Sequence, residues 1–206
     1  MSGERFLFLG DSVTDCDRDR NLKQPNRPEG LGNGWVNRVA TELLLNNGQR
    51  QVWNRGYSGC RTAELLAQPN WMPNRNGRFN CITVMIGIND IWHPFNQGVD
   101  HDLDAVTEAF DDLLARLKPF CNRLIVMEPL AIAGPAVTDA WWPLLDELQA
   151  RQQALANKAE ATWLALQSGF KAGSEAAPTL WAYDGVHPGV LGHRWLAEQW
   201  LAVYSD

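Results

Sequence analysis

The sequence predicts an α/β fold in which a five-stranded parallel sheet lies between two layers of helices. Two observations predict it. Short apolar runs alternate along the chain with segments of helical periodicity, as in a doubly wound sheet whose crossovers are helices. A turn of Gly, Asp and Ser also follows the first run at once, as expected where a buried strand ends. The five runs are residues 6–9, 51–54, 82–86, 124–127 and 162–166.

Helical spacing of apolar residues marks the segments between these runs. We expect a helix around Trp35, a longer one ending at Lys118-Pro119, a third after a cap at Thr138 or Asp139, and a last one starting near Pro188. Their apolar faces consist of Trp35, Val39 and Leu43; Leu103, Val106, Phe110, Leu113 and Leu117; Trp141, Leu145, Leu148 and Leu155; and Leu196, Trp200 and Val203.

Three connections are predicted as loops: residues 17–33, 68–78 and 129–135. The first is long and polar for a compact domain, which is typical of functional loops or of partial disorder. Because it begins just after the Gly-Asp-Ser turn, we expect it to form a wall of any site there.

Length and composition limit the class of protein. The 206 residues, 45% of them hydrophobic, suit one domain over residues 1–206. A net charge of -6 without a basic cluster argues against a nucleic-acid or anionic-membrane partner, and favours a small neutral ligand. The strand at residues 6–9 leaves no room for a cleavable leader, so we expect a cytoplasmic protein. The oligomeric state, including a homo-oligomer, stays open.

The four cysteines have no CxxC spacing and are expected to be reduced thiols in or near the core: Cys16, Cys60, Cys81 and Cys121.

Ser12, in the turn Gly10-Asp11-Ser12, is a candidate nucleophile because it would lie at the carboxyl end of the first strand. Gly-Asp-Ser is also an ordinary turn sequence, in which Gly supplies a positive φ and the polar side chains bond to nearby backbone. Three later segments favour catalysis: 54–59 (Asn-Arg-Gly-Tyr-Ser-Gly), 87–90 (Gly-Ile-Asn-Asp) and 184–188 (Asp-Gly-Val-His-Pro).

With these four segments in this order, the chain resembles the SGNH hydrolases, a branch of the GDSL esterases and lipases. The resemblance spans residues 12–187 and implies a three-layer, flavodoxin-like SGNH hydrolase fold. Residues 14–16, 85–92 and 187–193 look most like the small acetylxylan-esterase-type deacetylases.

A serine hydroxyl needs a base, and His187 can take its proton. Asp184, three residues earlier, can hold the imidazole in the right tautomer. The resemblance implies an oxyanion hole made of the backbone N–H groups of Ser12 and Gly59 and the side chain of Asn89. The alternatives are turn roles for the glycines and a cap for Asn89.

Several other polar residues are expected to be structural. Asp11, Asp15 and Asp90 should order their loops by accepting backbone hydrogen bonds. His93, His101 and His193 have no metal-ligand spacing, so we expect surface or packing roles and no metal site. No Gly-x-Ser-x-Gly elbow and no nucleotide-binding glycine motif occurs, and no cofactor is expected.

Ten tryptophans are many for this length. Those at helical spacing should be core: Trp35, Trp141, Trp195 and Trp200. Trp92 and Trp181 lie close to Asn89 and Asp184 in the sequence, so both are candidates to line a substrate pocket, with core packing as the alternative.

The sequence therefore predicts a cofactor-independent serine esterase that forms an acyl-enzyme on Ser12. The resemblance implies that the substrates are short-chain esters, in particular acetyl esters of carbohydrates such as acetylated xylo-oligosaccharides. One alternative is a broader acyl esterase, thioesterase or lysophospholipase, which would have a long apolar channel. Another is a binding module on the same fold that recognises a glycan or a protein without catalysis.

Overall fold

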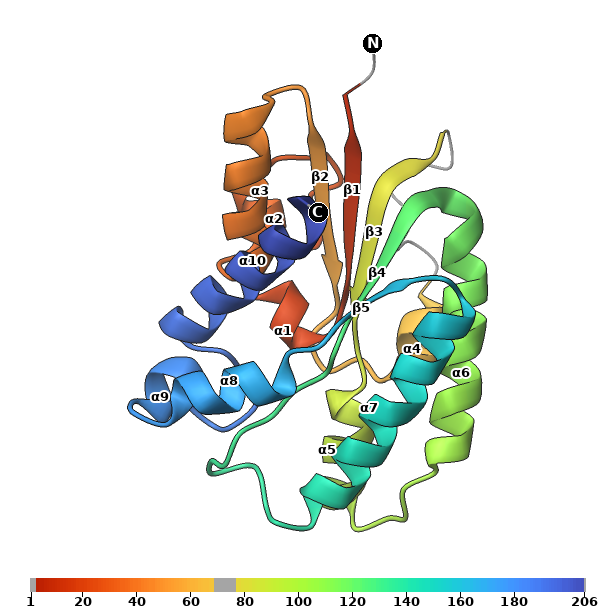
Figure 1. Cartoon of the computed structure of the whole chain (residues 1–206), viewed down its shortest axis with the longest axis vertical. Coiled ribbons are helices and arrows are strands. Elements are labelled where there is room, and N and C mark those ends of the chain that lie inside the picture. Colours follow the sequence, from red (N-terminus) through yellow and green to blue (C-terminus); the bar gives the residue numbers. More distant parts are fainter. Residues whose placement is uncertain (1–2, 69–76, 206) are drawn as a thin grey trace.

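The computed structural model describes residues 3–68 and 77–205. Its centre is a sheet of parallel strands in the order β2-β1-β3-β4-β5, with helices on both faces (Figure 1). The three-layer α/β/α fold and its five-stranded parallel sheet are confirmed. The strands are β1 (Arg5–Gly10), β2 (Gln51–Gly56), β3 (Phe79–Met85), β4 (Cys121–Met127) and β5 (Thr162–Leu164).

The strand order places a topological switch point between β1 and β3. Strand β1 pairs with β2 on one side and β3 on the other, and Gly10 is level with both Gly56 and Met85. The three strands therefore end at the same edge of the sheet. In open α/β sheets this is where ligands bind.

The two main helical layers are α3 (Trp35–Asn46) with α10 (Val190–Ser205) on one face, and α4 (Thr62–Ala67), α6 (Leu103–Leu117) and α7 (Trp141–Lys158) on the other (Figure 1). Shorter helices connect them, most of them too short to show a helical period in the sequence. These are α1 (Ser12–Asp15), α2 (Pro28–Leu31), α5 (Ile88–Gln97), α8 (Gln167–Ser174), α9 (Pro178–Trp181) and a 3₁₀ turn (Lys118–Phe120).

Several predicted boundaries differ from those in the structure; β3, for example, spans Phe79–Met85 instead of residues 82–86. Strand β5 ends at Leu164 rather than residue 166, because Glu128 accepts the N–H groups of Leu166 and Gln167 and turns the chain into α8. Helix α10 begins at Val190, near the predicted start, but Pro188 lies before the helix and not in its first turn. Helix α7 has Ala140 as its cap residue instead of Thr138 or Asp139, whose backbone carbonyls accept the first helical N–H groups.

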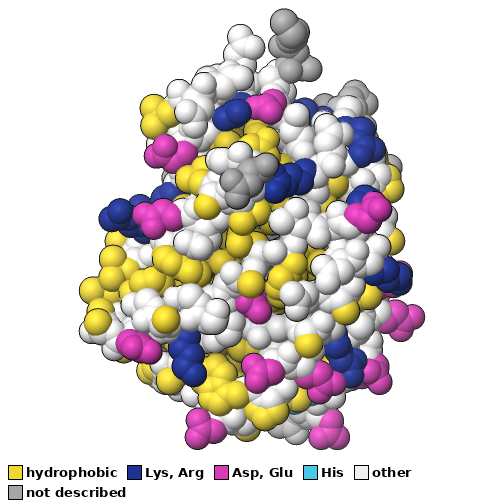
Figure 2. Space-filling view, viewed as in Figure 1, with side chains coloured by type: hydrophobic (Ala, Val, Ile, Leu, Met, Phe, Trp, Pro, Cys, Tyr) yellow, Lys and Arg dark blue, Asp and Glu magenta, His cyan; other side chains and the backbone are white. Residues whose placement is uncertain are grey.

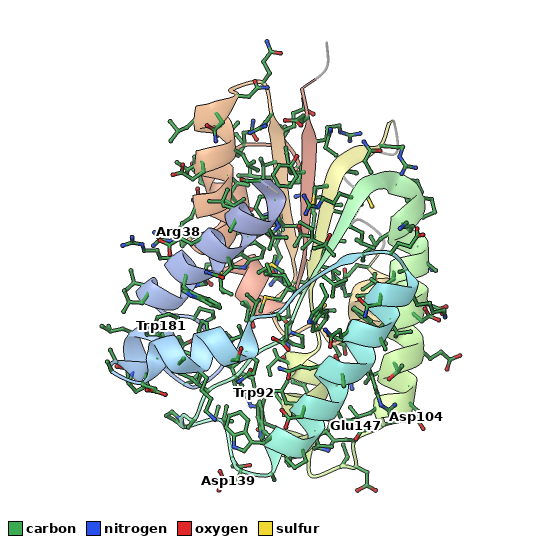
Figure 3. The ribbon with its side chains drawn as sticks, in the orientation of Figure 1. Arg38, Trp92, Asp104, Asp139, Glu147 and Trp181 are labelled. Carbon is green, nitrogen blue, oxygen red and sulfur yellow. The ribbon has the colours of Figure 1, made fainter. Side chains whose placement is uncertain are left out.

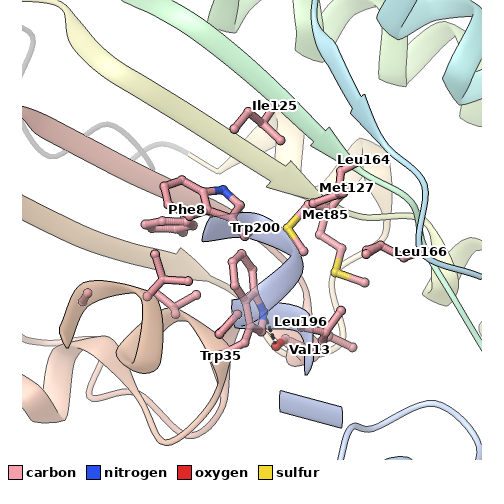
Figure 4. Close-up of a cluster of buried hydrophobic side chains, with 14 of the residues drawn as sticks. Phe8, Val13, Trp35, Met85, Ile125, Met127, Leu164, Leu166, Leu196 and Trp200 are labelled. Atoms are coloured by element: carbon pink, nitrogen blue, oxygen red, sulfur yellow. Dashed lines mark hydrogen bonds between the residues drawn. The ribbon is translucent and has the colours of Figure 1, made fainter. Parts of the chain in front are cut away.

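The core on the α3 and α10 side is aromatic (Figure 4). Phe8 packs against Trp35 and Trp200, with ring centroids 5.3 and 5.2 Å away. Each indole also donates a hydrogen bond, Trp200 to the Thr83 hydroxyl at 2.9 Å and Trp35 to the Val13 carbonyl at 3.0 Å. The second bond ties the core directly to α1.

The predicted core tryptophans Trp35, Trp141 and Trp200 are fully buried, whereas Trp195 is half-buried. All four cysteines are free thiols, and Cys81 and Cys121 are buried as expected. The predicted loop at 68–78 falls mostly outside the described residues. None of the helices in the described part of the chain has the length and apolar character needed to cross a membrane.

Candidate active site

Ser12 is the first residue of α1, immediately beyond the carboxyl end of β1. Asp11 precedes it as the helix cap, and its carboxylate accepts the N–H of Val13 at 3.0 Å. This is the loop-ordering role expected for Asp11. The serine hydroxyl is consequently held at the switch point of the sheet on a short helix that starts there.

A hydrogen-bonded chain joins the three residues predicted to act as a triad. The Ser12 Oγ lies 2.9 Å from His187 Nε2, and His187 Nδ1 lies 2.6 Å from Asp184 Oδ2. The network assigns the imidazole proton to Nδ1, which donates to the carboxylate, so that Nε2 can accept the serine proton. The fold therefore brings Ser12 against residues at the other end of the chain.

The Asp184 carboxylate is fixed by its own loop. Its other oxygen accepts the N–H groups of Val186 and His187 at 2.9 and 2.7 Å. Burial alone would raise the pKa of Asp184, but the hydrogen bonds from His187 and Val186 outweigh it and hold that pKa below its usual value. Asp184 is thus an anion suited to orient and stabilise a charged imidazole.

The loop at residues 129–135 supports this segment from outside. Ile132 N–H donates to the Gly185 carbonyl at 2.8 Å, and Ala136 N–H donates to the Asp184 carbonyl at 3.0 Å. Gly185 has a φ of 99°, which a side chain would strain. The turn that carries Asp184 and His187 is therefore braced by backbone bonds to a second loop.

Asn54 and Gly56, at the end of β2, position α1. The Asn54 amide donates to the carbonyls of Thr14 and Leu31 at 2.6 and 2.8 Å, and accepts the N–H of Gly56 at 2.8 Å. A Cβ on Gly56 would collide with the backbone of Asp15. Gly56 is needed for this close approach and not for a positive φ. Both residues hold the serine helix against the sheet.

Gly59 lies in the turn that follows β2, with a φ of 82°. A Cβ built there would meet nothing within 4 Å, so the turn is open beside this residue. The turn is tied to α1 because the Asp15 carboxylate accepts the N–H of Ser58 at 3.2 Å. Arg20 pairs with the same carboxylate at 2.8 Å. The expected structural role of Asp15 is confirmed.

Asn89 lies in the first turn of α5, just after β3, and is only 3% exposed. Its side-chain amide donates one hydrogen bond, to the Cys60 carbonyl at 3.0 Å. An asparagine amide carries two N–H donors, so one donor fixes its orientation and the second is available to a ligand. Ser12, Gly59 and Asn89 thus follow β1, β2 and β3, the three strands at the switch point.

Asp90 connects α5, the helix that carries Asn89, to the start of α4, which follows the turn of Gly59. Its carboxylate accepts the Thr62 N–H at 3.0 Å and the Thr62 hydroxyl at 2.7 Å. Burial raises the pKa of Asp90 to about 6 against these hydrogen bonds. The carboxylate is structural, as expected.

Asp11 is 2% exposed, and burial raises its pKa to about 7 against the opposing hydrogen bond from Val13, with a further increase from the charge of Asp90. Because the folded-state pKa lies above the unfolded value, the folded protein binds this proton more tightly. Asp11 therefore contributes to the free energy of unfolding at low pH, and this contribution is lost as the pH rises through about 7.

We therefore expect Asp11→Asn, which keeps an acceptor for Val13 but cannot ionise, to gain stability relative to the parent as the pH rises. Between pH 5 and 8 the relative gain should be about 3 kcal/mol, since a pKa difference of one unit is about 1.4 kcal/mol. Urea unfolding of both proteins at the two pH values measures it. A variant-to-parent difference that is the same at both would show that Asp11 does not titrate in this range.

One cavity opens at Ser12 and His187, with a volume of about 610 Å³. The 17–33 segment supplies Asp17 and Asn33, which confirms its expected place as a wall of the site. The remaining wall comes from the end of α1, α3, the turn after β2, the segment between α9 and α10, and the start of α10: Asp15, Cys16, Arg38, Ser58, Tyr183, Pro188, Gly189, Val190 and His193.

His193 and Cys16 pack together at this wall, with the ring Nε2 3.7 Å from the thiol. Burial lowers the pKa of His193 to about 4, helped by the charges of Arg38 and His187. His193 therefore packs as a neutral ring, in agreement with the surface or packing role expected for it. His101 bonds the Ile91 carbonyl at 2.9 Å. Among residues 3–68 and 77–205, no cluster of three or more His, Cys, Asp or Glu residues could hold a metal ion.

The two candidate tryptophans have different positions (Figure 3). Trp92, on α5, lies with its ring centroid 5.5 Å from that of His187 and 5.9 Å from that of Trp141, so it borders the triad. Trp181, at the end of α9, packs on Phe170 and Trp195 at 5.1 and 5.9 Å. Neither tryptophan is among the described residues that line the cavity at Ser12. The Trp181 indole packs in an aromatic cluster with residues of α8 and α10, which corresponds to the packing alternative.

Tyr183 is the aromatic residue that the sequence analysis missed. Its ring is stacked nearly parallel to that of His187, at 5.9 Å and 13°, and it is 59% exposed at the cavity. Its position directly before Asp184 is the one signal that could have identified it. Arg38, on α3, gives no such signal because it is distant in sequence from every catalytic segment.

The chain matches the model of the GDSL-like Lipase/Acylhydrolase family over residues 8–195. It is 31% identical to an acetylxylan esterase of Geobacillus stearothermophilus, over 97% of this chain and 93% of that protein. A solved structure of that bacterium's acetylxylan esterase superposes with a TM-score of 0.84 at 30% identity, covering 98% and 94% of the two chains.

A GDSL-like lipase structure from Parabacteroides merdae superposes with a TM-score of 0.88 at 31% identity, covering 98% of this chain and 95% of that one. The sheet order, the site at the switch point and these similarities agree with one another. The chain belongs to the GDSL-like lipase/acylhydrolase family and is a carboxylic ester hydrolase.

Proposed function

We propose that the protein hydrolyses short-chain esters, acetyl esters of carbohydrates above all, through an acyl-enzyme on Ser12. The observation that carries the proposal is the hydrogen-bonded chain from Ser12 through His187 to Asp184, which opens into a cavity whose lining residues are mostly of polar types. Ser12 is the nucleophile, His187 accepts and then returns the proton, and Asp184 orients and stabilises the imidazole.

In the first step Ser12 Oγ bonds to the ester carbonyl carbon while its proton passes to His187 Nε2. The bond from that carbon to the alcohol oxygen then breaks, and the alcohol leaves with the proton from His187. In the second step His187 takes a proton from water, whose oxygen attacks the acyl carbon. The carboxylic acid leaves as the proton returns to Ser12, and the enzyme is restored.

Both steps place negative charge on the former carbonyl oxygen, and fixed donors must stabilise it. We assign this role to the backbone N–H groups of Ser12 and Gly59 and to the free N–H of Asn89. Their positions after three adjacent strands support the assignment.

The relatives support the same residues. Structures of the Geobacillus acetylxylan esterase include catalytic mutants in which a serine, an aspartate and a histidine are each replaced by alanine. The aspartate and histidine of that enzyme have the spacing of Asp184 and His187. A further structure names it an acetyl-xylooligosaccharide esterase, which supports a carbohydrate ester as the substrate of this chain too.

A fluorophosphonate probe tests the mechanism directly. It should label the parent protein at one site, and peptide mapping should place the adduct on Ser12. Labelling of another residue, or hydrolysis that persists after complete labelling, would contradict the acyl-enzyme on Ser12.

We expect kcat/KM to fall by about tenfold or more from acetyl to butyryl esters, and further for octanoyl esters. The cavity at Ser12 has Pro188 and Val190 as its aliphatic residues beside many polar ones, so it offers no continuous aliphatic groove. Burial of a methylene contributes about 0.8 kcal/mol only where apolar atoms surround it. A series of nitrophenyl esters measures the dependence. Undiminished rates on octanoyl esters would favour the lysophospholipase or thioesterase alternative.

A further inference from the structure

An acetyl group fills only a small part of the cavity at Ser12. Its volume of about 610 Å³ lies within the range of whole small-molecule sites, roughly 300–1,000 Å³. Asp17, Arg38 and Val190 line this space together with Ser12 and His187. A substrate with a short acyl group would leave this space to its alcohol half.

An exposed aromatic ring stands at the entrance to this space. Tyr183 is 59% exposed, although it touches the catalytic imidazole. Figure 2 shows hydrophobic side chains gathered at the left of the view, where α9 and the start of α10 lie in Figure 1. The exposed hydrophobic residues of these two helices are Leu180, Val190 and Leu191. A flat aromatic face with a polar tip suits a ligand that is itself apolar on one face and polar at its edges.

Two charged groups on the cavity wall have unused hydrogen-bonding capacity. Within residues 3–68 and 77–205, neither the Asp17 carboxylate nor the Arg38 guanidinium forms an ion pair or a side-chain hydrogen bond. The charges of Asp17 and Arg38 affect different residues of the wall. After burial and Asp184, the charge of Asp17 contributes to the raised pKa of Tyr183, whereas Arg38 acts on His193.

The backbone of the cavity wall near Asp17 is anchored to α1 and the residue that follows it. The N–H of Asn33 donates to the Cys16 carbonyl at 2.8 Å, and Gly32 approaches the Asp15 and Cys16 carbonyls too closely for any side chain. The 17–33 segment is thereby closed back onto α1. Asp17, at a φ of 58°, is held at its beginning.

We propose that this cavity binds the alcohol half of the ester as a sugar subsite, with Tyr183 as the platform on which a pyranose ring stacks. Asp17 accepts hydrogen bonds from sugar hydroxyl groups, and Arg38 donates to ring or hydroxyl oxygens. The subsite deepens the carbohydrate esterase function proposed above and rests on it. It explains why the exposed Tyr183, rather than Trp181, lies beside His187.

The test compares an acetylated xylo-oligosaccharide with a nitrophenyl acetate, which lacks the sugar. Tyr183→Ala should lower kcat/KM on the oligosaccharide by about tenfold more than on the aryl ester, as expected for loss of an aromatic stack. Tyr183→Phe, which keeps the ring, should restore most of this difference. Asp17→Asn and Arg38→Gln should each lower the oligosaccharide rate selectively by a few-fold, typical of a single hydrogen bond.

Arg194→Ala is the matched control, because its side chain is exposed on α10 and does not line the cavity. It should leave the ratio of the two rates unchanged. Equal losses on both substrates in Tyr183→Ala would overturn the proposal, since Tyr183 would then only position His187.

A second measurement keeps the subsite separate from the proposed function. The oligosaccharide without acetyl groups should inhibit aryl acetate hydrolysis competitively, and Tyr183→Ala should weaken that inhibition about tenfold. If the parent hydrolyses aryl acetates but no acetylated sugar, the carbohydrate ester assignment fails. If the parent deacetylates sugars and inhibition is the same in parent and variant, the subsite alone fails.

Discussion

Ser12→Ala is expected to lower kcat on any ester by at least about 10³-fold while leaving the protein folded. Removal of a triad nucleophile elsewhere costs up to about 10⁶-fold, and the residual rate comes from the oxyanion hole and binding. The fold should survive because, within the described part of the chain, the Ser12 hydroxyl bonds only to His187. The bond that caps α1 comes from Asp11, which the substitution keeps. Initial rates on nitrophenyl acetate and a thermal melt of each protein measure the two effects.

Ser58→Ala is the matched control for this prediction. Ser58 lines the same cavity, and its backbone N–H, which the substitution keeps, is the group that bonds Asp15. It should retain most of the parent activity and react with a fluorophosphonate, whereas Ser12→Ala should do neither. Near-parental hydrolysis by Ser12→Ala would exclude Ser12 as the nucleophile.

The catalytic segments could be predicted from the sequence because each is short and its chemistry is local. Asp184 and His187 are three residues apart in one turn, and Ser12 follows an apolar strand directly. Parallel strands end at a common edge, so a correct α/β assignment predicts that the segments of Ser12, Gly59 and Asn89, which follow β1, β2 and β3, lie close together. Asp184 and His187 come after α9 instead of a strand, so their hydrogen-bonded chain to Ser12 rests on the family resemblance in the sequence and on the structure.

The wall of the cavity could not be predicted in the same way, because it depends on packing between distant elements. Trp181 and Tyr183 are two residues apart, but the first is drawn into a cluster with Phe170 and Trp195. That cluster involves α8 and α9, short helices for which the sequence gives no periodic signal. Arg38 reaches the cavity from a helix whose opposite face is core.

The bracing of the site was also only partly visible in the sequence. Asp11, Asp15 and Asp90 have the loop-ordering roles that their short side chains suggest. Asn54 could be identified as part of a motif, but its bonds to α1 and α2 depend on how those helices lie against β2. A motif therefore predicts which residues matter better than it predicts what each one touches.

Asn89→Ala is expected to lower kcat by about 10²- to 10³-fold, or about 3 to 4 kcal/mol of transition-state stabilisation, with little change in KM. The physical reason is that the two N–H groups of the Asn89 side chain have different roles. One N–H is held by the Cys60 carbonyl at 3.0 Å, so the other is fixed in place before the reaction begins. A donor that is already oriented needs no reorganisation when charge develops on the carbonyl oxygen.

Asn89→Asp should be at least as harmful as Asn89→Ala. An ionised carboxylate has no donor, would face the Cys60 carbonyl as a second acceptor, and would place negative charge beside the developing oxyanion. Because Asn89 is buried, each variant also leaves a carbonyl without its partner, at a cost of about 1 to 3 kcal/mol in stability. Thermal melts beside the kinetics separate this structural loss from the catalytic one.

Thr62→Val provides the control that decides between these readings of Asn89. It removes the hydrogen bond from the Thr62 hydroxyl to Asp90. The substitution therefore weakens the connection between α4 and α5 but keeps the proposed donor, the side-chain amide of Asn89. We expect its kcat to stay within a few-fold of the parent, because the backbone N–H of Thr62 still bonds Asp90. If Thr62→Val loses as much kcat as Asn89→Ala, the effect of Asn89 is structural. If Asn89→Ala raises only KM, Asn89 binds the ground state instead of the oxyanion.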